Sequence, residues 1–319
     1  MSGDIYHGDC LEEMKTLPAN HVDTIITDPP YGLSFMGKEW DKGVPGVPFW
    51  SEMLRVSKPG AMLLAFGGTR TFHRMTCAIE DAGWELRDCM MWLYGSGFPK
   101  SHNLHGTFEG WGTALKPAWE PIIVAMKPIE GTFAENAKKW GVAGLNVDGG
   151  RIGTGAKTWT TPRGGIWATA PDATGELIVN SKGRWPANLI LDEEAGVMLG
   201  EPSRFFYCAK ASKSERNAGC EGMPEVQTTD GCVRSNPESA RKYQANSSLR
   251  NNHHPTVKPL KLMEYLCTLT KTPTGGIVLD PFAGSGTTGL ACANTGRNYI
   301  LIEREQKYID IILARLEGK

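Results

Sequence analysis

Two loops, each directly behind an apolar strand, constrain this chain more than any other feature. The first covers residues 28–31, after the strand-like segment 22–27, and contains two consecutive prolines. The second covers residues 280–288, after the apolar run 276–280, and is rich in glycine. Proline ends a strand because it cannot donate a ladder hydrogen bond, and glycine permits the tight turn that opens a helix. Both loops therefore mark strand ends, where open α/β sheets bind their ligands.

Strand-like and helix-like segments alternate on both sides of a long irregular stretch. Strands are expected at 22–27, 61–66, 84–94, 121–126, 276–280 and 298–302, and helices at 11–17, 49–57, 71–81, 260–270, from 287 onwards and 306–316. Strands that are separated by helices pair in parallel. The pattern predicts an α/β fold with a doubly wound, mostly parallel sheet.

The alternation disappears between about residues 131 and 252. This stretch is rich in Gly, Thr, Ser and Asn and gives only brief strand signals, such as Leu189–Leu191. It is typical of an insertion of loops and short strands. We therefore expect two halves of one core, 1–128 and 251–319, with an inserted region at 129–250.

Composition limits the class of protein. With 319 residues, 40% hydrophobic and 22% charged, the chain is expected to fold as a soluble protein. It has no apolar run of roughly 20 residues and no secretory signal, so we expect no membrane association. Eight cysteines without a CxxC pair favour reduced thiols in a cytoplasm. The formal charge of −1 neither indicates nor excludes nucleic acid.

The glycine-rich loop predicts a nucleotide-like cofactor. Gly284, Gly286 and Gly289 fit the GxGxxG pattern, and Glu303 ends the next strand at a spacing that suits a ribose-binding acid. That pattern alone also fits a dinucleotide, or a tight turn without a ligand. Asp280 at the strand tip disfavours a pyrophosphate and favours the ammonium and sulfonium charges of S-adenosylmethionine.

The proline loop offers the groups that a planar base with an exocyclic amine requires. Asp28 and the Pro29 carbonyl can accept the two amine hydrogens, and Tyr31 offers a ring for stacking. An Asp-Pro turn without function is the alternative.

In combination, these motifs resemble the β class of amino-group DNA methyltransferases, which modify adenine N6 or cytosine N4. The resemblance covers about residues 1–128 and 251–319 and rests on segments 6–10, 28–31, 254–259 and 280–288. The catalytic motif precedes the insertion and the cofactor motif comes after it. This order implies a circularly permuted, Rossmann-like core that depends on S-adenosylmethionine, with target recognition in the inserted region.

The resemblance also implies residue roles. The catalytic loop would be Asp28, Pro29, Pro30 and Tyr31. The cofactor would be held by Asp9, Cys10, Lys258, Asp280, Pro281, Phe282, Gly284, Ser285, Gly286, Thr287 and Glu303. For three of these residues a second interpretation stays open: Asp9 suits a helix N-cap, Glu303 the start of the last helix, and Lys258 a DNA phosphate.

Basic residues exceed acidic ones between Pro202 and Lys258, nine against five, which makes this strip the candidate for phosphate contact. We expect DNA contacts from Lys100, Lys210, Lys213 and Arg216. Cys208, Cys220, Cys232, His253 and His254 are spaced too widely for a zinc site, and we expect no metal.

The implied function is methyl transfer to adenine N6 in double-stranded DNA, directly onto a flipped base. Asp28 favours adenine over cytosine N4, which is the first alternative. A dinucleotide-dependent oxidoreductase and a non-catalytic DNA-binding protein are more distant ones. The implied setting is the cytoplasm of a bacterial or phage-infected cell, with a possible homodimer. The sequence does not decide whether an endonuclease partner exists.

Overall fold

The computed structural model describes residues 2–33, 41, 43–95, 97, 99, 101–153, 157–159, 178–180, 182–209, 213–229 and 247–317. Two of the predicted DNA-binding residues, Lys100 and Lys210, lie outside these residues.

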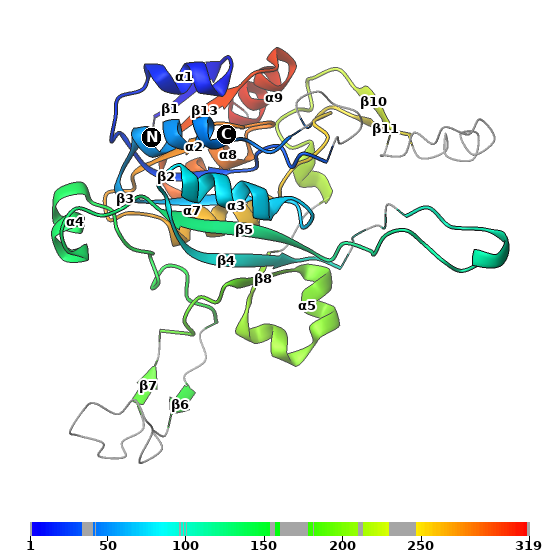
Figure 1. Ribbon diagram of the computed structural model, residues 1–319, viewed down its shortest axis with the longest axis horizontal. Helices are drawn as coiled ribbons and strands as arrows, with labels where there is room; N and C mark the ends of the chain where they lie inside the picture. Colours follow the sequence, from blue (N-terminus) through cyan, green and yellow to red (C-terminus); the bar gives the residue numbers. More distant parts are fainter. Residues whose placement is uncertain are drawn as a thin grey trace.

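Within this part of the chain, nine strands form one central sheet (Figure 1). In spatial order they are β1 (Gly3–His7), β13 (Asn298–Glu303), β12 (Ile277–Asp280), β2 (Val22–Thr27), β3 (Ser57–Phe66), β5 (Trp119–Met126), β4 (Glu85–Leu93), β8 (Leu189–Asp192) and β9 (Tyr207–Ala209). Every neighbouring pair is parallel except the two that β5 forms with β3 and β4. The expected mostly parallel sheet is confirmed, and β12 lies beside β2 although the insertion separates them in sequence.

Helices cover both faces of the sheet. On one face lie α1 (Cys10–Thr16), α2 (Val47–Val56) and α3 (Phe72–Asp81), and on the other α7 (Leu260–Leu269), α8 (Thr287–Thr295) and α9 (Gln306–Glu317). Successive strand side chains point to opposite faces, so Ile25 packs in the first layer and Ile26 in the second. Because both faces are covered, all six residues of β2 are buried, including the polar Asp23, Thr24 and Thr27.

The stretch 129–250 contains more regular structure than its composition predicts. It contributes β8 and β9 to the main sheet, and it forms α4 (Phe133–Trp140) and α5 (Glu193–Leu199). It also forms two separate two-stranded antiparallel sheets, β6 (Lys157–Trp159) with β7 (Ile178–Asn180) and β10 (Val226–Thr229) with β11 (Ser247–Arg250). The α4 helix begins with a local sequence signal, a capping box of Thr132 and Glu135.

Several strand boundaries differ from the expectation by one or two residues, and the start of β3 differs by four. The β3 strand begins at Ser57 and passes through Pro59 and Gly60, because a register shift opposite Val22 and Thr24 removes the need for an amide hydrogen at Pro59. The first strand, β1, was not expected, since it is a short edge strand that pairs only with β13.

Arg297 links three parts of the core and was not predicted. The side chain is fully buried, and its guanidinium donates to the Gly275 and Cys267 carbonyls at 2.9 and 3.1 Å and to the Thr270 and Thr24 hydroxyls, both at 2.9 Å. It therefore ties β2 to the end of α7 and to the turn before β12.

We expect Arg297→Met to lower the free energy of unfolding by roughly 3 kcal/mol, because two buried carbonyls lose their donor. Urea unfolding measures this loss. The matched control is Arg87→Met, since Arg87 is exposed and should change stability by less than about 0.5 kcal/mol. Equal losses in the two variants would contradict the structural role of Arg297.

Candidate functional site

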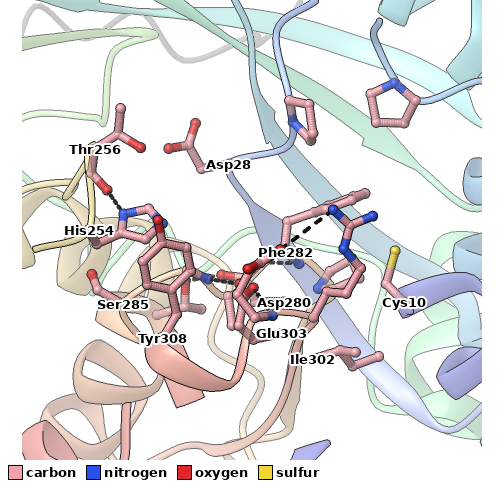
Figure 2. Close-up of a pocket in the computed structure, with 18 of the residues that line it drawn as sticks. Cys10, Asp28, His254, Thr256, Asp280, Phe282, Ser285, Ile302, Glu303 and Tyr308 are labelled. Carbon is pink, nitrogen blue, oxygen red and sulfur yellow. Dashed lines mark hydrogen bonds and ion pairs between the residues drawn. The ribbon is translucent and has the colours of Figure 1, made fainter. Parts of the chain in front are cut away.

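A cavity of about 310 Å³ opens at the carboxyl ends of β2, β12 and β13. Most of the predicted site residues line it: Asp9, Cys10, Asp28, Pro30, Lys258, Asp280, Pro281, Phe282, Gly284, Ser285, Thr287 and Glu303. Figure 2 shows the labelled side chains around one space, with Asp28 on one side and Glu303 and Tyr308 on the other. Pro29, Tyr31 and Gly286 are not among the lining residues. The two loops recognised in the sequence thus share one cavity.

A hydrogen bond joins the end of β2 to the first residue of the glycine-rich loop. Thr27, the last residue of β2, donates its hydroxyl to one oxygen of Asp280 at 2.8 Å. Asp280 also accepts from the Thr288 hydroxyl at 2.5 Å and from the Phe282 amide at 3.1 Å. Burial raises the pKa of Asp280 to about 6, although these three donors favour the ionised form. A carboxylate is therefore held in place at the floor of the cavity.

The glycine loop requires glycine at two positions. Gly284 and Gly286 have φ values of 53° and 75°, in the left-handed region. A Cβ atom on Gly284 would lie 2.8 Å from the His254 imidazole, and Gly286 is the N-cap of α8. The loop thus brings its backbone close to the cavity wall before the helix begins.

Arg315 holds this loop from behind and was missed by the sequence analysis. Its buried guanidinium donates to the Ser285 carbonyl at 2.6 Å and to the hydroxyls of Ser285 and Thr287, both at 3.1 Å. In the sequence, Arg315 has the pattern of an ordinary basic residue near a helix end, so only the packing of α9 reveals its role.

The acids at the two edges of the cavity are both fixed by backbone amides. Glu303 ends β13 and accepts from Gly284 and Glu305, both at 2.9 Å, while burial raises its pKa. Asp9 accepts from the Leu11 amide at 2.9 Å, which confirms the N-cap interpretation, and it also lines the cavity. Next to it, burial raises the pKa of the Cys10 thiol to about 12, so this thiol stays protonated.

Aromatic rings form further walls. Tyr308 packs edge-on against His254, with ring centroids 4.5 Å apart, and Phe49 lies 6.2 Å from Phe282. Burial lowers the pKa of His254 to about 4, so its imidazole is neutral near pH 7. We did not predict Phe49 and Tyr308, because an aromatic residue in a helix reads as core.

A polar cluster surrounds Asp28. One oxygen of Asp28 accepts from the Tyr31 hydroxyl at 2.7 Å, and the other lies 3.0 Å from the Lys258 ammonium. Glu120, the second residue of β5, accepts from the same two donors, from Tyr31 at 3.1 Å and from Lys258 at 3.0 Å. Sequence analysis missed Glu120, whose only signal is a carboxylate at the start of an apolar strand.

Electrostatics keep Lys258 charged. Burial alone favours the neutral amine, but the carboxylates of Asp28 and Glu120 outweigh it and raise the pKa of Lys258 above its usual value. Burial and the same carboxylates also raise the pKa of Tyr31, so the phenol stays protonated. The predicted contact of Lys258 with a cofactor carboxylate or a DNA phosphate stays a prediction.

The remaining DNA-binding predictions concern Lys213 and Arg216, which form the two ends of a short 3-10 helix, Lys213–Arg216. Arg216 donates to the His254 carbonyl, and its own carbonyl accepts from Asn252 at 2.9 Å. The structure thus places Arg216 behind the cavity wall, and its contact with DNA stays a prediction.

Within the described residues, no group of three His, Cys, Asp or Glu side chains is arranged to hold a metal ion. Cys232 lies outside those residues. No helix in the described part of the chain combines the length and the apolar character that crossing a bilayer requires.

Known proteins are similar in sequence to this chain over nearly its whole length. The Type II methyltransferase M.HindIII of Haemophilus influenzae is 24% identical over 370 aligned residues, covering 98% of this chain and 94% of its own. M.Cfr9I of Citrobacter freundii, also described as a Type II methyltransferase, is 25% identical and covers 99% and 88%. Among solved structures, the PvuII DNA methyltransferase (cytosine-N4-specific) has the same fold. Its TM-score is 0.53 at 16% identity, and the match covers 100% of this chain and 94% of that one.

A family model gives the decisive match. The model that describes the N6/N4 DNA methylases aligns with residues 22–314, which include both loops of the cavity and the insertion between them. The chain therefore belongs to the N6/N4 DNA methylase family.

Proposed function

We propose that this protein transfers a methyl group from S-adenosylmethionine to the N6 amine of adenine in double-stranded DNA. The observation that carries the proposal is the shared cavity, which Asp28 and Pro30 enter from one side and the loop after Asp280 from the other. A methyl donor in the acidic half would lie beside an amine held by the proline loop.

The cavity suits S-adenosylmethionine chemically. Its carboxylates Asp9, Asp280 and Glu303 suit the ribose hydroxyls and the positive charges of such a ligand, and its aromatic walls suit a purine. The bound cofactor supplies an electrophilic methyl group on a sulfonium. The chain itself orients the two reactants and excludes water from between them.

Asp28 would activate the amine of the target base. The lone pair of an aromatic amine is delocalised into the ring, and acceptance of both hydrogens by Asp28 and the Pro29 carbonyl would localise it. Asp28 already contacts Tyr31 and Lys258, yet a carboxylate offers about four acceptor sites. The target base must leave the helical stack to reach this site.

The choice of adenine rests on Asp28, and cytosine N4 is the second candidate. The PvuII enzyme, which is described as cytosine-N4-specific, shares the fold, so the fold alone does not select the base. The test is to methylate unmodified plasmid DNA with the purified protein and to analyse its nucleosides by mass spectrometry. We expect N6-methyladenine, and N4-methylcytosine in its place would overturn the adenine assignment.

Cofactor affinity should depend on the ionisation of Asp280. The pKa of Asp280 is about 6, and a ligand with ammonium and sulfonium charges favours its ionised form. We therefore expect the Kd for S-adenosylmethionine to rise as pH falls through 6, by up to about tenfold for each pH unit. Calorimetric titration between about pH 5 and pH 8 measures it.

Asp280→Asn is the matched variant for this prediction, because it keeps the shape and removes the titrating group. We expect it to bind S-adenosylmethionine more weakly at pH 7.5 and with a smaller pH dependence. His254 does not interfere with the measurement, since its pKa of about 4 lies below the window. An unchanged pH dependence in Asp280→Asn would assign the titration to another group, such as Glu303.

A further inference from the structure

The chain leaves the sheet between β4 and β5 as a long arm, whose residues 101–118 reach well beyond the body of the molecule (Figure 1). The arm is a hairpin whose two sides are joined by hydrogen bonds. The Leu104 amide donates to the Trp111 carbonyl at 2.8 Å, and the His102 amide donates to the Thr113 hydroxyl at 2.9 Å. Its tip is a single turn of 3-10 helix, Gly106–Phe108.

The arm exposes large apolar side chains that the fold does not use. Phe108 is 51% exposed, Trp111 is 64% exposed and Leu115 is 92% exposed. The rings of Phe108 and Trp111 pack against each other edge-to-face, with centroids 5.7 Å apart. Apolar side chains gathered on a projecting element mark an interaction surface more often than a lone exposed residue does.

Topology places this arm at the same edge of the sheet as the cavity. The β5 strand is antiparallel to both β3 and β4, so the end of β4 lies at the edge where β2, β12 and β13 also end. The arm returns to the sheet at β5, whose second residue is Glu120, the partner of Lys258 in the polar cluster. The arm therefore begins and ends beside the point where a target base must enter.

Charge on the arm is compatible with a polyanion. Between residues 101 and 117 the sequence has one acid, Glu109, against Lys116 and the two histidines His102 and His105. Glu109 lies 3.6 Å from His105, and Lys116 donates to the Gly95 carbonyl at 2.6 Å. No cluster of carboxylates in this range opposes DNA phosphates.

We infer that this arm binds the DNA duplex, with Phe108 and Trp111 packing on the bases next to the extruded one. Extrusion of a base exposes the faces of its neighbours, and aromatic side chains stack on exposed bases with little sequence preference. Apolar side chains are also used as wedges between base steps. The inference rests on the DNA substrate of this family and not on the choice of adenine.

The test is the double variant Phe108→Ala/Trp111→Ala, assayed for methyl transfer to unmodified plasmid DNA. We expect the KM for DNA to rise about tenfold or more, as the loss of a base stack predicts. The Kd for S-adenosylmethionine and the urea unfolding midpoint should stay unchanged, because both side chains are exposed. Trp111→Phe keeps an aromatic ring and should recover most of the affinity in an otherwise unchanged chain.

Leu86→Ala is the control. Leu86 is an exposed apolar residue at the start of β4, so it lies at the edge of the sheet opposite to the arm and outside the inserted region. We expect its KM for DNA to be unchanged. An unchanged KM in the arm variant would overturn the inference, and so would an equal rise in Leu86→Ala.

Ultracentrifugation gives a further test. If the wild-type protein is a dimer and the arm variant is a monomer whose KM for DNA is unchanged, the inference is overturned. The tip then forms a contact between two copies. The identity of the methylated nucleoside is read separately. A failure of the adenine assignment would therefore leave this test intact.

Discussion

Asp28→Ala should reduce methyl transfer by about three orders of magnitude or more, because the amine loses its principal acceptor at the moment its lone pair is needed. Lys258 and Tyr31 keep a partner in this variant, since Glu120 accepts from both. The cofactor loop is held separately by Arg315 and Glu303, so the Kd for S-adenosylmethionine should change little. Single-turnover transfer of a radiolabelled methyl group and calorimetry measure the two effects.

Asp28→Asn sharpens this result. The amide has nearly the shape of the carboxylate but offers one acceptor oxygen and no charge. We expect it to be nearly as inactive as alanine, which would separate the loss of charge from the loss of shape. Glu80→Gln, an exposed acid on α3, is the control and should keep full activity. Full activity in Asp28→Ala would exclude Asp28 from the chemistry.

The sequence predicted the two loops correctly because their signals are local. An apolar strand before Asp28 and another before Asp280 determine where each loop begins, and the prolines and glycines determine the backbone path of each turn. That the loops meet depends on β12 pairing with β2, which no local signal in either segment reveals. Short motifs with a fixed backbone are therefore the part of this site that can be predicted from the sequence.

The residues that sequence analysis missed act across long distances in the chain. Arg315 lies on α9 but binds the loop at Ser285, and Glu120 lies on β5 but binds Lys258. Neither has a local pattern that distinguishes it from a surface charge. The strand signal at Leu189–Leu191 is confirmed as β8, but β9 was not predicted, since three residues are too few to show a period. Their pairing depends on the open edge that β4 offers.

The charge balance around Asp28 gives the second large effect. Lys258 is the cation that contacts both Asp28 and Glu120, each at 3.0 Å. In Lys258→Met no cation offsets the repulsion between the carboxylates of Asp28 and Glu120, so one of them should take up a proton at neutral pH. We expect kcat to fall about 100-fold at pH 7, with the acid limb of the pH profile displaced toward higher pH.

The double variant Lys258→Met/Glu120→Gln tests this explanation, because it removes one positive and one negative charge together. Asp28 then ionises without an adjacent carboxylate, and we expect about a tenfold recovery of kcat over Lys258→Met. The kcat profiles of the wild type, both single variants and the double variant, from about pH 5 to pH 9, form the complete cycle.

Other titrating groups near Asp28 should not explain differences between the pH profiles of these proteins. His254 and Asp280 interact electrostatically with Asp28, but neither contacts Lys258 or Glu120 in the described structure. Their contribution should be the same in all four proteins. If the double variant is no more active than Lys258→Met, or if the acid limb stays in place, then Lys258 acts on the substrate or the cofactor directly, and charge balance at Asp28 is not its role.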